Sequence, residues 1–263
     1  MDLARRAARP DNVTASVETY SVDGKNISAE ECRGIFRTTK LGDRQLRVLS
    51  FIEGDRVLDI GCYAGNFVSE VIRRFPEKTV TGIDYFEDHI RIAKLVFPEI
   101  ASSFRQMSIY NLEFEGATLD CVTLQEVLEH LEGAAQAVKE INRVLKVGGA
   151  LIVSVPNPFY IRAMLSFFRF ELRNAWRRFR GDKTRLGTEV YFQEIEWNRH
   201  IFSWTPQTLL TLFAVNGFEY VEHCYENGMT NPIERLFLKA FPFFGPTQIL
   251  KVRKISVASA ALV

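Results

Sequence analysis

The sequence predicts an α/β fold in which a mostly parallel sheet carries helices on both faces. Between residues 56 and 157, short apolar runs rich in β-branched residues alternate with longer amphipathic runs, and the connections are short. This alternation is typical of a doubly wound parallel sheet. The first apolar run, 56–60, leads into a glycine turn and a helix-like segment, an arrangement that brings backbone close to a bound nucleotide in such folds.

Within this region the alternation predicts five strands and three helices. The strands are expected at 56–60, 78–83, 102–107, 119–124 and 149–155. The helices are expected near 65–75, 87–96 and 134–146. Because ligands of an open parallel sheet bind beyond the carboxyl ends of its strands, the residues at those ends should line one crevice. They are Asp59, Asp84, Ser108, Gln125 and Glu126.

The amino-terminal flank is expected to form an arm followed by two helices. Residues 1–28 are rich first in Arg and then in Thr, Ser, Asp and Gly, which favours a mobile segment. The run Ser28-Ala-Glu-Glu31 matches a capping box and predicts a helix start. A second helical stretch is expected at 41–52.

The carboxyl-terminal flank is expected to complete the sheet. Gly148-Gly149 predicts a helix stop before the strand at 149–155. Thr205-Pro206 predicts a capped helix that ends near residue 215. The last two strands are expected at 217–221 and 248–254. A second apolar, aromatic segment, 233–244, lies between them.

The composition favours one α/β domain with an insertion. The chain has 263 residues, of which 47% are hydrophobic and 25% charged, and its net charge of +1 gives no global attraction to nucleic acid. The four cysteines are scattered without a C-x-x-C pair, which argues against a zinc site or a disulfide framework and favours reduced thiols in the cytoplasm. The first ten residues lack the apolar core of a secretory signal, and no apolar run is long enough to span a bilayer.

Four motifs in order give the chain a family resemblance. They are the run from Arg56 to Gly65 (RVLDIGCYAG), the strand that ends in Asp84, the run from Leu119 to Leu131, and the run from Val144 to Asn157. With these motifs the chain resembles the class I S-adenosylmethionine-dependent methyltransferases. It is most similar to the type 11 group that contains the ubiquinone-biosynthesis O-methyltransferases. The resemblance implies a Rossmann-like sheet with an antiparallel last strand, and S-adenosylmethionine as cosubstrate.

The resemblance and the residue pattern together predict four parts along the chain. Residues 1–45 would be an amino-terminal arm and helical cap, and 46–157 the cofactor-binding core. Residues 158–199 would be a basic aromatic helical insertion, and 200–263 would complete the sheet domain.

The resemblance also assigns cofactor contacts. Asp59 would lie near the amino group of the methionine portion, Gly61 and Gly65 would allow close backbone approach, and Asp84 would accept from the ribose hydroxyls. Ser108 stands where the family often has an acid, so the backbone of Ile109 is an alternative adenine contact. The full predicted set is Asp59, Gly61, Cys62, Tyr63, Gly65, Asp84, Tyr85, Ser108, Ile109 and Gln125. Because Tyr63 replaces the middle glycine of G-x-G-x-x-G, a nicotinamide dehydrogenase is disfavoured.

Two histidines are candidates for the catalytic base. His130 follows the fourth strand near the expected methyl position, and His200 follows the insertion. Histidine titrates near neutral pH, which suits removal of a hydroxyl proton. The alternative for His130 is a helix-start residue bonded to backbone. A divalent metal held by Glu126, Glu129, His130 and His200, as in the small-RNA 2′-O-methyltransferases, is a further alternative that we do not favour.

The insertion carries a basic amphipathic pattern. On a helical wheel over 160–180, large apolar residues share one face and arginines form an adjacent stripe. Such a helix is typical of membrane-surface or partner-binding elements, and the alternative is an ordinary cap over the active site. We therefore expect a cytoplasmic methyltransferase that acts on oxygen of a small-molecule, glycan or lipid-linked acceptor, with peripheral membrane association left open. Metal-assisted RNA 2′-O-methylation and a non-catalytic adaptor on the same scaffold are the alternatives.

Overall fold

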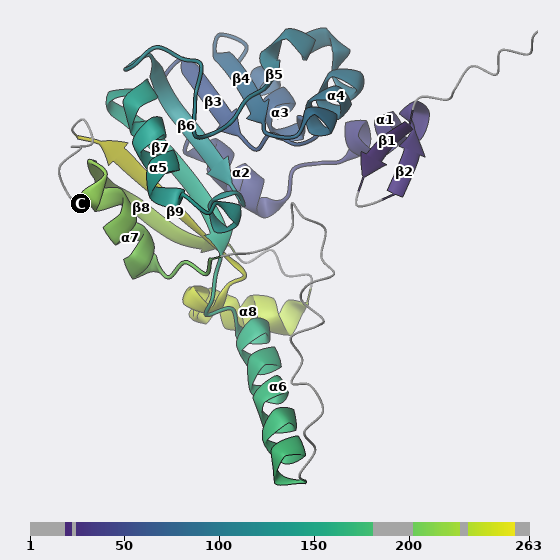
Figure 1. The fold of residues 1–263 in the computed structure, drawn as a ribbon, viewed down its shortest axis with the longest axis vertical. Coiled ribbons are helices and arrows are strands. Elements are labelled where there is room, and N and C mark those ends of the chain that lie inside the picture. Colours follow the sequence, from purple (N-terminus) through teal and green to yellow (C-terminus); the bar gives the residue numbers. More distant parts are fainter. Residues whose placement is uncertain (1–18, 23–24, 181–201, 227–230, 256–263) are drawn as a thin grey trace, which may run out of the picture.

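The computed structural model describes residues 19–22, 25–180, 202–226 and 231–255 (Figure 1). Its centre is a seven-stranded sheet in the order β5-β4-β3-β6-β7-β9-β8. The strands are β3 (Arg56–Ile60), β4 (Thr79–Asp84), β5 (Phe104–Gln106), β6 (Leu119–Gln125), β7 (Leu145–Pro156), β8 (Phe218–Glu226) and β9 (Thr247–Lys254). The pairs among β3 to β7 are parallel, whereas β9 runs antiparallel to both β7 and β8. The predicted mostly parallel sheet with an antiparallel last strand is confirmed.

Helices cover both faces of this sheet because side chains alternate along the strands. On one face, Leu58 and Ile60 pack in a core with α5 and α7; on the other, Val57 packs in a core with α3 and α4. The eight helices of the described residues are α1 (Ala29–Thr38), α2 (Asp43–Ser50), α3 (Asn66–Arg74), α4 (Glu87–Val96), α5 (Ala134–Val144), α6 (Ile161–Phe179), α7 (Pro206–Val215) and α8 (Pro232–Ala240). These two cores hold the strands in place, including the carboxyl ends where the sequence predicts the ligand site.

The helix starts follow the capping residues. The Ser28 hydroxyl accepts from the backbone N–H of Glu31, and the Glu31 carboxylate accepts from the Ser28 N–H, so the predicted capping box forms. Thr205 and Thr208 form the corresponding pair at the start of α7, with Pro206 in the first turn. These contacts satisfy backbone N–H groups that have no partner within the helix.

Two short segments differ from the prediction. Where the sequence predicted a mobile arm through residue 28, β1 (Thr19–Val22) pairs antiparallel with β2 (Lys25–Ser28). Gly148-Gly149 is not a helix stop, because α5 already ends at Val144 and β7 runs through both glycines. A Cβ on Gly149 would lie 3.0 Å from the Asp120 carbonyl oxygen, so the strand needs glycine there.

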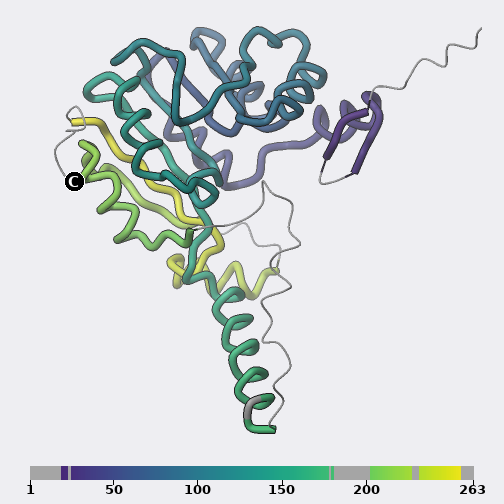
Figure 2. The backbone as a smooth tube through the Cα atoms, viewed as in Figure 1, coloured from purple at the N-terminus to yellow at the C-terminus, as the bar shows by residue number. Residues whose placement is uncertain are grey.

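The described part of the predicted insertion, up to residue 180, contains one long helix, α6. In Figures 1 and 2, α6 extends away from the sheet, and α8 lies across its root. The Arg162 guanidinium pairs with the Glu234 carboxylate at 2.5 Å, which ties α6 to α8. Among the described residues, no helix combines the length and hydropathy needed to cross a membrane.

Candidate functional site

The turn after β3 is held against the end of β4. The backbone N–H groups of Gly61 and Cys62 both donate to the Ile83 carbonyl, at 2.8 and 3.0 Å. The next N–H, that of Tyr63, donates to Oδ2 of Asp84 at 3.0 Å. Tyr63 adopts φ 46°, a left-handed conformation that is uncommon for a residue with a large side chain. The turn therefore brings the ends of the first two predicted strands together.

The two glycines of this turn make room for the protein's own side chains. Gly61 has φ +79°, and a Cβ there would lie 2.4 Å from Cγ2 of Val127. Gly65 has φ +82° at the start of α3, and a Cβ there would lie 2.6 Å from the Phe104 ring. Their left-handed backbone and tight packing both require glycine. The expected backbone approach of a cofactor stays a prediction.

Asp84 is a buried carboxylate with three contacts from the protein. Besides the bond from Tyr63, its Oδ1 accepts from the Phe86 N–H at 3.0 Å and lies 3.0 Å from Nδ1 of His89. A carboxylate offers about four acceptor positions, so about one remains for a ligand hydroxyl. His89 lies in the first turn of α4 and was not predicted, because the sequence does not show which way its ring turns. Tyr85, a member of the predicted set of cofactor contacts, is 68% exposed.

Asp59 lies at the adjacent strand end in a buried polar cluster. The parallel register of β3 and β6 sets it beside Thr123, whose hydroxyl donates to Oδ1 at 2.6 Å. Nε2 of Gln125 lies 3.5 Å from the same oxygen. Burial raises the pKa of Asp59 to about 7, because the charged form loses its hydration; the hydrogen bonds offset this in part.

This cluster fits the amino group of S-adenosylmethionine. Oε1 of Gln125 is buried and has no hydrogen-bond partner among the described residues. It shares the site with the carboxylates of Asp59 and Asp84, so the end of the sheet presents acceptor oxygens and negative charge. An ammonium group would supply the missing donors and neutralise the carboxylates.

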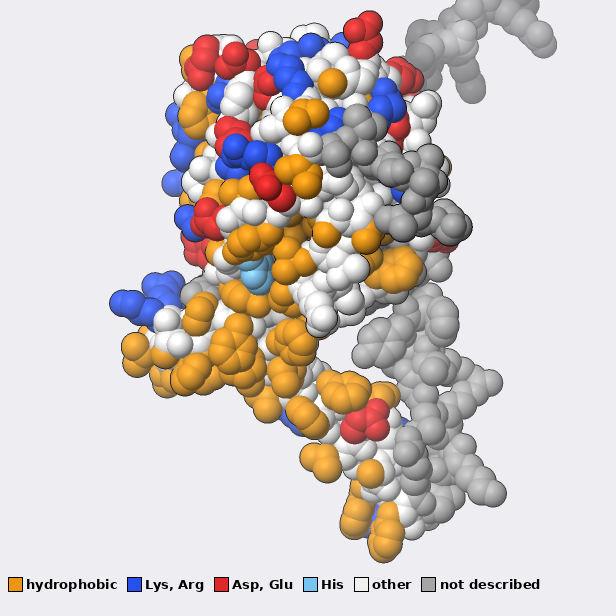
Figure 3. Space-filling view, turned by 90° about the vertical axis from the view of Figure 1, so that its left-hand side faces the viewer, with side chains coloured by type: hydrophobic (Ala, Val, Ile, Leu, Met, Phe, Trp, Pro, Cys, Tyr) orange, Lys and Arg blue, Asp and Glu red, His pale blue; other side chains and the backbone are white. Residues whose placement is uncertain are grey.

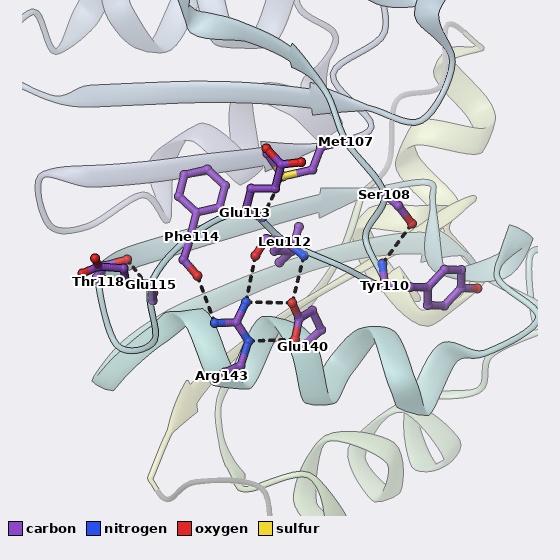
Figure 4. A network of polar contacts seen from close by, with 10 residues as sticks. All are labelled: Met107, Ser108, Tyr110, Leu112, Glu113, Phe114, Glu115, Thr118, Glu140 and Arg143. Carbon is purple, nitrogen blue, oxygen red and sulfur yellow. Dashed lines mark hydrogen bonds and ion pairs between the residues drawn. The ribbon is translucent and has the colours of Figure 1, made fainter.

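Ser108 lies beyond the short strand β5, in a loop tied to α5 (Figure 4), and Ile109 follows it in the chain. The Ser108 hydroxyl accepts from the Tyr110 N–H at 3.3 Å, and the Ile109 side chain packs in the core. Arg143 of α5 donates to the carbonyls of residues 112 and 114, at 2.8 and 2.9 Å, and so anchors the loop. These contacts hold the loop in place but do not test adenine binding. An adenine contact through Ser108 or Ile109 therefore stays a prediction.

The run from Glu126 to His130 separates its two acids. Glu126 adopts φ 54° and pairs with Arg44 of α2 at 3.0 Å. Glu129 lies in a turn of 3₁₀-helix (Leu128–His130), is 1% exposed, and neither of its carboxylate oxygens has a hydrogen-bond partner within the described ranges. Burial, with the nearby Glu126 charge, raises the pKa of Glu129 to about 8.

His130 is next to this acid, with Nε2 3.9 Å from Oε1 of Glu129. The part of the chain that the structure describes contains no cluster of three or more His, Cys, Asp or Glu residues placed to hold a metal ion. His200, the other predicted base and fourth metal ligand, lies outside the described residues.

A cavity of about 310 Å³ adjoins this turn at the carboxyl ends of β6 and β7. It lies among the turn after β6, the residues that follow β7, the first turn of α6 and the segment before α7. Its lining residues are Glu129, Pro156, Asn157, Pro158, Ala163, Phe202, Ser203 and Trp204. The cavity was not predicted, because its walls come from segments that lie far apart in the sequence and meet only in the tertiary structure.

The comparisons with known proteins agree with this geometry. The model of the methyltransferase domain family matches residues 34–223. A ubiquinone biosynthesis O-methyltransferase of Alkalilimnicola ehrlichii is 34% identical over 131 residues, which cover 48% of this chain and 52% of that protein. The chain thus spans about half the length of the curated relatives it matches.

Solved structures share the fold at low sequence identity. A methyltransferase of Haloferax volcanii, solved in complex with the Trm112 methyltransferase activator, has a TM-score of 0.57 and 15% identity over 87% of this chain and 94% of that one. The [4+2]-cyclase SpnF has a TM-score of 0.53 and 18% identity over 90% of this chain and 87% of that one. Because the family match covers most of the chain, the protein belongs to the methyltransferase domain family.

Proposed function

We propose that this protein is an S-adenosylmethionine-dependent methyltransferase that acts on a hydroxyl oxygen of a small-molecule, glycan or lipid-linked acceptor. The observation that carries the proposal is the cavity that Glu129 lines, next to His130 and at the same edge of the sheet as Asp59 and Asp84. A cofactor site and an acceptor site would then share the carboxyl ends of the strands. The O-methyltransferase name of the relative supports oxygen as the acceptor atom.

In this proposal the chain positions two molecules and removes one proton. S-adenosylmethionine, when bound, supplies a methyl group on a sulfonium centre. Asp59 and Gln125 bind its amino group, and Asp84 accepts from a ribose hydroxyl. His130 would take the acceptor's hydroxyl proton as the methyl carbon exchanges its bond to sulfur for a bond to oxygen, so that the methylated oxygen and the thioether sulfur are both left uncharged.

The test is transfer of labelled methyl into fractionated cell extract, with small-molecule, lipid, glycan, protein and RNA fractions counted separately. We expect label in a small-molecule, lipid or glycan fraction, and a loss of at least 100-fold in His130→Gln with unchanged binding of S-adenosylhomocysteine. Label in RNA alone would support the RNA alternative instead. Full activity of His130→Gln would exclude this histidine as the base.

The surface of α6 and α8 supports a membrane-borne acceptor. Figure 3 shows hydrophobic side chains gathered over the lower part of the molecule, where Figure 1 places these helices. The exposed members are Phe159, Leu165, Phe167, Phe168, Leu172, Trp176, Phe179, Ile233, Leu236, Phe237, Phe241 and Phe243. So large an apolar surface marks an interaction site.

The charges beside this surface favour an anionic bilayer as its partner. Arg169, Arg173 and Arg177 of α6, and Arg180 directly after it, are all exposed. Aromatic side chains that enter the headgroup region, with arginines that meet lipid phosphates, are the features of an interfacial helix. The α6–α8 face would therefore hold the enzyme at the surface where a lipid-linked acceptor lies.

Sedimentation with vesicles tests this part of the proposal. The full chain should bind vesicles of phosphatidylcholine with 30% phosphatidylglycerol more tightly than vesicles of phosphatidylcholine alone, and binding should weaken in high salt. The variant Trp176→Ser/Phe179→Ser should lose about tenfold in binding while it still binds S-adenosylhomocysteine. Equal sedimentation of the variant and the parent protein would exclude these side chains as the contact.

A further inference from the structure

The cavity beside Glu129 contains two polar side chains that the protein leaves without partners. Both oxygens of the buried Glu129 carboxyl group and Nε1 of Trp204 lack hydrogen bonds among the described residues, and both residues line the cavity. A buried polar group without a partner costs about 1–3 kcal/mol, so native structures seldom contain two in one place without a function. A ligand that supplies both partners would recover this free energy.

Hydrogen bonds to the backbone carbonyls of Glu129 and Trp204 hold the two segments that carry these groups. The Phe202 N–H donates to the Glu129 carbonyl at 3.1 Å, which joins the segment before α7 to the turn after β6. The Trp204 carbonyl accepts from Nε2 of Gln248, on β9. The Phe202 and Trp204 rings lie 5.7 Å apart. The cavity wall is therefore held in place while its polar side-chain atoms stay unsatisfied.

Another polar member of the wall, Asn157, has a partner for each of its side-chain polar atoms. Nδ2 of Asn157 donates to the carbonyls of Phe243 and Gly245, at 2.8 and 2.7 Å, and its Oδ1 accepts from the Phe159 N–H at 3.0 Å. Asn157 thus has a structural role, which is to fix the segment between β7 and α6. The contrast singles out Glu129 and Trp204 as the groups available to a ligand.

We infer that this cavity binds the polar head of the acceptor, with Glu129 accepting a hydrogen bond from a hydroxyl other than the one that is methylated and the Trp204 indole N–H donating to an oxygen of the same molecule. The inference rests on the proposed function for its choice of ligand. Pro156, Pro158 and Phe202 give the cavity apolar walls, which suits a ring that carries the hydroxyl.

The size of the cavity limits what part of the acceptor enters it. Its volume of about 310 Å³ is at the small end of the range for ligand pockets, which run from about 300 to 1,000 Å³. Ala163, in the first turn of α6, forms part of its wall. A longer apolar arm of the acceptor would therefore leave the cavity along α6, beside Leu165 and Phe168, which are exposed on that helix.

The experiment measures binding of phenol and of anisole. Anisole has a methyl group in place of the hydroxyl hydrogen of phenol, so it cannot donate a hydrogen bond. Binding to the full chain is followed by the indole N–H resonances in nitrogen-15 NMR, and Trp204→Phe identifies the Trp204 signal. Phenol should shift that signal, and Glu129→Met, which removes both acceptor oxygens, should weaken phenol binding about five- to tenfold, the value of one hydrogen bond. Anisole should bind the parent protein more weakly than phenol does.

Glu132→Met is the matched control, since this exposed acid lies three residues along the same loop. It should leave phenol binding unchanged, and S-adenosylhomocysteine binding by all variants confirms that they fold. Equal binding of phenol and anisole, or of phenol to the parent and to Glu129→Met, would overturn the inference. No methyl transfer is needed in this test, so a failed transfer assay with intact phenol binding would count against the proposed function and not against the site.

Discussion

Glu129→Gln should make the protein more stable at high pH but not at low pH. The carboxyl group is 1% exposed, and burial raises its pKa from 4.5 to about 8. Between these two values the folded protein keeps a proton that the unfolded chain has released. Folding stability must therefore fall as the pH rises from about 4.5 through about 8.

The size of the effect follows from the same two values. At 1.36 kcal/mol per pH unit, the full change corresponds to at most about 5 kcal/mol in the free energy of unfolding. Glutamine has a similar shape and no charge, so it resembles the protonated acid at every pH. The variant should match the parent protein below about pH 4.5 and exceed it by several kcal/mol above about pH 8.

Urea unfolding of both proteins at pH 5, 7 and 9 measures the difference directly. Asp59, whose pKa is also raised, contributes a slope of the same sign to both proteins, so it cancels in the comparison. Glu132→Gln, at an exposed position, controls for the loss of one negative charge. A difference between Glu129→Gln and the parent protein that is the same at pH 5 and pH 9 would refute the reasoning.

Three further substitutions test other parts of the structure. Gly65→Ala should lower the free energy of unfolding by about 2–4 kcal/mol in urea, because the residue has φ +82° and its Cβ would meet the Phe104 ring at 2.6 Å; wild-type stability would contradict the turn geometry. Asp84→Asn should weaken S-adenosylhomocysteine binding at least tenfold by isothermal titration calorimetry, since an amide replaces one acceptor oxygen; unchanged affinity would remove Asp84 from the cofactor site. Arg162→Ala should cost less than about 1 kcal/mol, because its ion pair with Glu234 is largely exposed on the arginine side; a larger loss in urea unfolding would mean that this pair, rather than packing, holds α6 to α8.

The sheet could be predicted because its signals are local. Asp59 and Asp84 each end an apolar run, and the parallel register places both at one edge of the sheet. The hairpin of β1 and β2 also had a local signal in Asp23-Gly24, a dipeptide that favours two-residue turns, but its polar surroundings suggested an arm. Gly149 lies within a strand and not at a helix end because its backbone comes close to Asp120, and no local sequence pattern shows this contact.

The partners within the candidate site were much less predictable. The sequence gives no sign that His89 turns back to Asp84, or that Arg44 pairs with Glu126 across more than eighty residues. The burial of Glu129 also depends on the segment from Phe202 onward, which comes back to the sheet after the insertion. Such contacts are set by tertiary packing, whereas spacing along the chain reports only the secondary structure.

The position of β9 has a consequence for synthesis on the ribosome. This strand lies between β7 and β8 although it comes last of the three along the chain, and its pairing with β7 joins residues about a hundred positions apart. Until residues 247–254 have left the ribosome, the strongly apolar β7 has an unpaired edge, which is prone to wrong pairing with other chains. We expect the nascent protein to depend on chaperones during this interval, and a circular permutant that supplies β9 before β7 to depend on them less.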